Sequence, residues 1–138
     1  MALTIEDKGL DELIKQFHGG SKVAKRETHD AMEKSVLTIQ REASSYTQYN
    51  PPHRPGQTYT RTFTMARTMS VKVHTLAGGI RGYVRGGVWY AQLVRGEQQA
   101  WMHVGRWRTL MRIAEEKKAA IDGFFRKAQV NVIRYLGR

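Results

Sequence analysis

Two apolar stripes with helical spacing, one toward each end of the chain, constrain the fold more than any other feature. The first predicts a helix over residues 22–48, because apolar or small residues recur there every three or four positions. Its members are Ala24, Thr28, Met32, Val36, Ile39, Ala43 and Tyr46. Charged residues fall mostly off this stripe, so one face of the helix should pack on a core.

The second stripe predicts the strongest helix of the chain, over residues 107–136. Its members are Trp107, Leu110, Met111, Ala114, Ile121, Phe124, Phe125, Ala128, Val132 and Tyr135. Gly123 lies inside this stretch, where it costs about 1 kcal/mol relative to Ala. It would permit either close packing or a bend, and Gly137 suits the end of the helix.

Shorter elements are predicted before the first long helix. Residues 3–5 form either a short strand or the lead into a helix. A short helix should follow, since apolar residues are spaced by three, one and three positions at Leu10, Leu13, Ile14 and Phe17. Gly19-Gly20 would end it, and Ser21 is a candidate N-cap for the long helix.

The middle of the chain favours strands. Apolar and polar residues alternate over 69–76 and 79–86, on either side of a glycine turn, which predicts a β-hairpin. Residues 88–94 form either a short helix or a third strand. Residues 58–68 form either a strand or, over 63–69, a short helix.

A proline-rich segment, Asn50-Pro51-Pro52-His53-Arg54-Pro55-Gly56, can be neither helix nor central strand. We expect an extended arm over about residues 49–58 within one domain, 1–138, rather than a linker between two. The predicted class is α+β: long N- and C-terminal helices packed on a small, mainly antiparallel β-sheet, with an extended Pro-rich loop. Such a sheet offers an edge to another subunit.

The composition restricts the kinds of site and the cellular location that we expect. The chain has no Cys, which excludes disulfides and thiolate metal sites. It has no bilayer-length apolar run and no signal-peptide pattern at its start, so we expect a soluble protein made inside the cell. The net charge of +11 divides into −1 over residues 1–49, +9 over 50–112 and +3 over 113–138. A basic centre attracts nucleic acids and acidic protein surfaces alike.

Basic residues in that centre are the candidate contacts for a polyanion. They are Arg54, Arg67, Lys72, Arg81, Arg85 and Arg95. Aromatic residues among them, such as Tyr83 and Trp89, could stack on bases. No RRM, KH or helix-turn-helix signature is present. A simpler interpretation is that the alternation in the hairpin places the Lys and Arg side chains in solvent. A small basic nucleic-acid-binding module is therefore kept as the alternative function.

Catalytic patterns are absent from the sequence. The five His share no metal-binding spacing, and the Ser residues lack a nucleophile-elbow context. Glu97 and His103, six positions apart, are the one conceivable acid/base pair. A simpler interpretation pairs Glu97 with a nearby Arg. We therefore expect no enzyme, no cofactor and no metal.

Large aromatics gather between residues 89 and 107, at Trp89, Tyr90, Trp101 and Trp107. These are more rings than a small core needs beside one loop. Trp, Tyr and Arg are enriched in the hot spots of protein interfaces. The stretch therefore indicates a contact surface, although its rings could instead fasten the loop to the C-terminal helix.

Two segments resemble a family of phage proteins. Residues 49–71, YNPPHRPGQTYTRTFTMARTMSV, resemble a segment of the neck, or tail-completion, proteins of long-tailed phages, minor tail components related to the lambda Z protein. Residues 89–110, WYAQLVRGEQQAWMHVGRWRTL, are similar to the more specific signature of one branch. The resemblance covers about residues 20–135. One departure is Phe63, which stands where many relatives have a turn glycine.

The resemblance implies a structural virion protein at the head–tail junction, made in the bacterial cytoplasm. Such proteins form rings, commonly hexameric, that contact other neck, connector and tail-tube proteins and complete the tail. Packaged DNA is a further candidate contact. The predicted interface residues are Tyr59, Arg61, Trp89, Tyr90, Glu97, Trp101, His103, Arg106 and Trp107. The motif also includes Gly96 and Gly105.

Overall fold

The computed structural model of the chain describes residues 2–7, 21–45, 55–56, 64–77 and 79–137. Its elements are β1 (Ala2–Asp7), α2 (Ser21–Ser44), α3 (Thr64–Arg67), β2 (Ser70–Leu76), β3 (Gly79–Arg85), α4 (Ala91–Arg95), α5 (Leu110–Glu116) and α6 (Lys118–Leu136). Two long helices and a small sheet make the fold α+β, which confirms the predicted class. No helix in these ranges is long and apolar enough to cross a membrane.

The sheet has three strands in the order β1-β3-β2, and both pairings are antiparallel. The predicted hairpin is confirmed as β2 and β3. Residues 3–5 belong to a strand, which was one of the two alternatives, and β1 supplies the third strand. Residues 91–94 of the ambiguous 88–94 segment belong to helix α4, which ends at Arg95.

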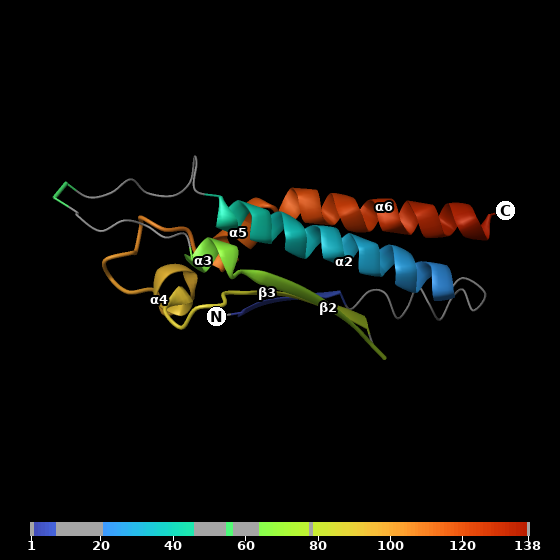
Figure 1. Cartoon of the computed structure of the whole chain (residues 1–138). Coiled ribbons are helices and arrows are strands. Elements are labelled where there is room, and N and C mark those ends of the chain that lie inside the picture. Colours follow the sequence, from blue (N-terminus) through green and yellow to red (C-terminus); the bar gives the residue numbers. More distant parts are fainter. Residues whose placement is uncertain (1, 8–20, 46–54, 57–63, 78, 138) are drawn as a thin grey trace.

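Helix α2 lies between the sheet and α6 (Figure 1). The two helices run antiparallel to each other. The fully buried Met32, Val36 and Ile39 of α2 share one core cluster with Ile80 and Val84 of β3. The predicted stripe of α2 is confirmed from Ala24 to Ala43, since all its members in that span are buried. Burying apolar side chains on both sides of α2 is the main force holding the layers together.

Gly82 of β3 sets how closely α2 can approach the sheet. A Cβ added there would lie 2.5 Å from Cγ1 of Val36 and 2.7 Å from Sδ of Met32. Contacts that short do not occur without a shift of the neighbouring atoms. The glycine therefore leaves room for two fully buried side chains of α2.

The prediction of a single helix over residues 107–136 is wrong in two respects. It begins at Leu110, where the Thr109 hydroxyl caps it by accepting from the backbone N–H of Arg112. It is then divided at Lys117, whose φ of −94° and ψ of 4° depart from helical values. Trp107 consequently lies outside the helix.

Three further expectations for this stripe fail. Met111 and Tyr135 are exposed rather than in the core, and the buried residues of α5 are Leu110 and Ile113. Gly123 neither bends α6 nor allows close packing, since a Cβ there would meet nothing within 4 Å.

Several predictions elsewhere can be placed. The first long helix ends at Ser44, four residues before the predicted end, and Ser21 is its first residue. Helix α3 agrees with the helical alternative for 63–69. The helix predicted over 10–17, Tyr46 and most of the Pro-rich arm lie outside the described residues, although Pro55 and Gly56 form an exposed turn.

Candidate functional site

Residues 96–109, here called the aromatic loop, connect α4 to α5 and are closed at their base by hydrogen bonds. The side-chain nitrogen of Gln99 donates to the carbonyl of Val94 at 2.6 Å and to that of Trp107 at 2.8 Å. The backbone N–H of Ala100 donates to the carbonyl of Leu93 at 2.8 Å. One glutamine thus ties together the two ends of the loop.

Arg95 lies under the loop and is only 1% exposed. One of its Nη atoms donates to the carbonyl of Arg108 at 3.2 Å, and its guanidinium carbon lies 5.1 Å from the ring centroid of Trp107. This position favours a cation–π interaction. The prediction that Arg95 contacts a polyanion is therefore wrong: the residue is buried, and it supports the loop from within.

The tip of the aromatic loop exposes large apolar side chains. Trp101 is 81% exposed, Val104 61% and Met102 42%. The backbone beneath them is ordered by turns, in which the carbonyl of His103 accepts from the N–H groups of Arg106 and Trp107 at 3.0 Å. Gly105 has a φ of +74°, a left-handed conformation that favours glycine. Apolar side chains displayed on such a backbone are typical of a binding surface.

A second exposed tryptophan precedes α4. Trp89 is 81% exposed, and its ring meets that of Tyr90 edge to face, with the centroids 5.6 Å apart. Figure 1 shows α4 and the aromatic loop at the end of the molecule where α2 ends and α5 begins. Both exposed tryptophans therefore belong to the same end of the protein.

The predicted interface residues divide by exposure. Trp89, Glu97 and Trp101 are exposed, whereas Tyr90, His103, Arg106 and Trp107 are half-buried. The ring of Trp107 packs on Arg95 of α4 and its carbonyl accepts from Gln99, so these contacts are with α4 and with the loop itself. Tyr59 and Arg61 lie outside the described residues.

Three residues of the loop were not among the predicted interface residues: Gln99, Met102 and Val104. The roles of Met102 and Val104 follow from the exposed apolar run that they share with Trp101. Gln99 lies in the segment that carries the resemblance, but its role does not follow from the sequence, because its two acceptors are backbone carbonyls whose positions depend on the path of the loop.

Where the aromatic loop meets α5, Arg108 joins two acidic side chains. It donates to Glu42 of α2 at 2.9 Å and also pairs with Glu116 of α5. Lys117 lies 3.4 Å from the second carboxylate oxygen of Glu42. These pairs fasten α5 and the end of the loop to α2.

The same contacts shift two pKa values. Burial alone would raise the pKa of Glu42, but hydrogen bonds from Arg108 and Lys117 outweigh it and hold that pKa below its usual value. Burial alone would lower the pKa of Arg108, but hydrogen bonds to Glu42 and Glu116 raise it. Both shifts favour the charged forms of Glu42 and Arg108, which pair with each other.

The conceivable acid/base pair is not assembled. Among the described residues, no hydrogen bond or ion pair joins Glu97 to His103. Glu97 instead lines an open hollow of about 440 Å³ between β1, α4 and α5, together with Gln92, Gly96 and Thr109. That lining contains no nucleophile activated by a neighbouring base.

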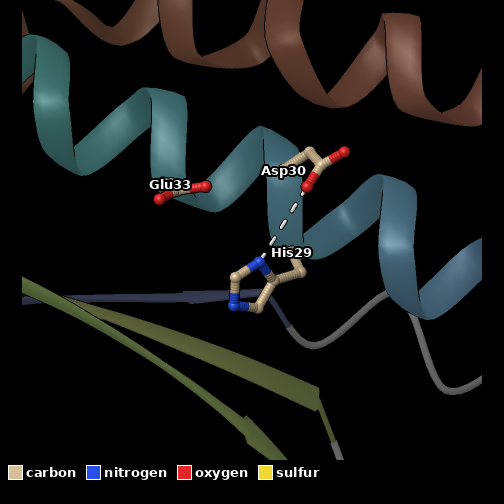
Figure 2. Close-up of side chains that lie close together, drawn as sticks. All are labelled: His29, Asp30 and Glu33. Atoms are coloured by element: carbon tan, nitrogen blue, oxygen red, sulfur yellow. Dashed lines mark ion pairs between the residues drawn. The ribbon is translucent and has the colours of Figure 1, made fainter.

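One group with metal-ligand atoms was not predicted. His29, Asp30 and Glu33 of α2 offer ligand atoms that lie within 4.8 Å of one another. Nδ1 of His29 is 4.0 Å from a carboxylate oxygen of Asp30, and Figure 2 shows the His29 ring projecting on the side of α2 that faces the sheet. The two acids are exposed and all three residues come from one stretch of helix, and no second element that the structure describes adds a ligand to the group.

The remaining candidate polyanion contacts lie mainly on the sheet. Lys72, Arg81 and Arg85 are exposed on the face turned away from α2, here called the open face. Arg67 is exposed on α3, and Arg54 lies outside the described residues. No described element covers the open face (Figure 1). The fold therefore brings together three of the predicted cations from two strands.

Comparison with protein-family models, with curated proteins and with solved structures finds no match for this chain. The resemblance to phage neck proteins therefore depends on the residues of the two sequence segments alone.

Proposed function

We propose that this chain is a non-enzymatic structural protein that assembles through the tip of the aromatic loop, as part of the head–tail junction of a long-tailed phage. The observation that carries the proposal is the 81% exposure of Trp101 on a backbone held by its own hydrogen bonds. The resemblance of residues 49–71 and 89–110 supports the choice of the phage junction among assembly roles.

The exposed aromatics supply a driving force for assembly. Covering one mostly exposed tryptophan side chain removes apolar area worth about 3–5 kcal/mol. The loop needs little ordering on binding, because Gln99 and Arg95 already hold its base. A preorganised surface loses less conformational entropy when it binds, so more of this energy appears as affinity.

A ring is the assembly that we propose. The loop tip lies at one end of an elongated molecule, and a contact between this end and a different surface of the next copy is heterologous (Figure 1). Heterologous contacts close into a ring when the rotation between copies is suitable. The resemblance favours six copies, placed between the tail and the connector of a filled head.

The proposal is tested first by mass in solution. At micromolar concentration, light scattering should find a species of about 95 kDa, six copies of the 15.8-kDa chain, in both about 0.15 M and 0.5 M salt. Trp101→Ser should shift the mass toward that of the monomer. Ile133→Ser is the matched control, because Ile133 is 59% exposed on α6, away from the loop.

A second test covers assembly that requires a template. The gene would be deleted from the phage genome that carries it, and the particles examined by electron microscopy. We expect separate filled heads and tails, joined again when the wild-type chain or Ile133→Ser is supplied but not with Trp101→Ser. Joined, infectious particles in the absence of the gene would refute the proposal.

A further inference from the structure

The strand register arranges the open face as three rows across the sheet. The register positions are Ala2–Arg85–Ser70, Thr4–Tyr83–Lys72 and Glu6–Arg81–His74. Every second residue points the same way in a strand, and Leu3, Ile80 and Val84 point to the buried side. The rows therefore form one continuous surface that no described element covers (Figure 1).

This surface is strongly basic. Lys72, Arg81 and Arg85 are all exposed, and the register position opposite Arg81 on β1 is Glu6. Among the described residues, no carboxylate pairs with Lys72 or Arg85. Arg81 and Arg85 are four positions apart on β3, which separates their Cα atoms by about 13 Å, and Lys72 lies between them on β2. The cations thus follow a line along the strands.

An aromatic ring lies in the middle of these cations. Tyr83 occupies the central position and meets the His74 ring edge to face, with the centroids 5.5 Å apart. Lys72, Tyr83, Arg85 and Ser70 line a hollow of about 520 Å³. Because Ser70 and Ala2 are small, the side chain of Arg85 stays accessible from the hollow.

We propose that the open face binds single-stranded nucleic acid without reading its sequence. Lys72, Arg81 and Arg85 contact successive phosphates, and a base stacks on Tyr83. Proteins that bind single strands without sequence preference usually combine cations along the nucleic-acid backbone with aromatic side chains on which bases stack. The proposal does not depend on a role in phage assembly, because the open face and the aromatic loop share no residue.

The ligand chemistry follows from the residues present. Phosphate contacts fix position without sequence information, and the face offers no Asn or Gln for base recognition. A stacking site also favours a single strand over a duplex, whose bases are already stacked. An acidic protein surface would satisfy the cations but would supply no base to stack on Tyr83.

The test measures fluorescence anisotropy of a labelled oligothymidylate of about 20 nucleotides with the full chain, at salt from about 0.05 to 0.2 M. Lys72→Ala/Arg85→Ala should weaken binding at least tenfold and lower the slope of log affinity against log salt by about 1.4, for two lost phosphate contacts. Tyr83→Leu should weaken binding by about tenfold and leave that slope unchanged. Circular dichroism would show that each variant is folded.

The matched control is Arg126→Ala/Lys127→Ala, which removes two exposed charges from α6. It should change affinity less than twofold. Equal weakening by this control would mean that net charge, rather than the open face, attracts the oligonucleotide, and would overturn the proposal. Equal or tighter binding of a duplex of the same length would also overturn it, as would displacement of the oligonucleotide by an equal charge of polyglutamate.

Discussion

Replacing Gly82 with Ala tests the packing of α2 on the sheet. The new Cβ would lie 2.5 Å from Val36 Cγ1 and 2.7 Å from Met32 Sδ, on two side chains with no exposed surface. The Met32 thioether can rotate, but Val36 is stiff at χ1 and is fixed by the backbone of α2. The helix or the strand must therefore shift.

Overpacking of this kind typically lowers the free energy of unfolding by about 1–3 kcal/mol. For a chain of 138 residues, 2 kcal/mol should lower the Tm by about 5–10 °C. The control is Gly123→Ala on the exposed side of α6, where a Cβ meets nothing within 4 Å. That change should stabilise the protein by about 0.5–1 kcal/mol, because alanine favours a helix over glycine.

The assay is urea unfolding followed by far-ultraviolet circular dichroism, since Trp89 and Trp101 are mostly exposed and report unfolding weakly. The midpoint should fall for Gly82→Ala with an unchanged m-value. A double-mutant cycle with Val36→Ala should recover at least 0.5 kcal/mol, because it removes the nearest atom. A folded Gly82→Ala protein as stable as the wild type would refute the reasoning.

Three further predictions concern the core, the ion-pair cluster and the loop. Ile113→Ala should cost about 2–5 kcal/mol in urea unfolding, because the side chain is fully buried, and a cost below 1 kcal/mol would contradict its place in the core. Glu42→Gln should lower stability at pH 7 by about 2 kcal/mol. The lowered pKa of Glu42 adds stability that is complete above its usual value of 4.5 and is lost as pH falls through the lowered pKa. The variant should therefore lose less stability below pH 4.5 than the wild type. An equal loss of stability in both proteins below pH 4.5 would argue against this. Gln99→Ala should speed amide hydrogen exchange at residues 101–107 by tenfold or more while lowering global stability by less than about 2 kcal/mol, and unchanged exchange would show that Gln99 does not hold the loop.

The parts of the fold that depend on local patterns were predictable from the sequence. The stripe from Ala24 to Ala43 repeats with the period of a helix, and each member that the structure describes in that span is buried. The hairpin follows from alternation on either side of a glycine turn. Near-neighbour periodicity decides these elements, and a single sequence contains it in full. The exposure of Trp89 and Trp101 also agrees with the prediction of a contact surface.

Other features depended on contacts between distant residues. Lys117 divides a helix whose apolar spacing predicts continuity, and Arg108, bonded to Glu42 66 positions away, fastens α5 to α2 just before that division. Arginine side chains usually lie at the surface, yet Arg95 is buried because the chain folds back over it at Trp107 and Arg108.

The open face shows the same division. Its cations were recognisable in the sequence, and the predicted hairpin of β2 and β3 holds all three of them. The pairing of β1 with β3, about 80 positions apart, adds the third strand of that face. Sequence alone therefore determined the stripe of α2, the hairpin and which residues carry charge or large rings. The tertiary structure decided which of those side chains are buried as supports and which are displayed, because burial depends on what the chain brings against each residue.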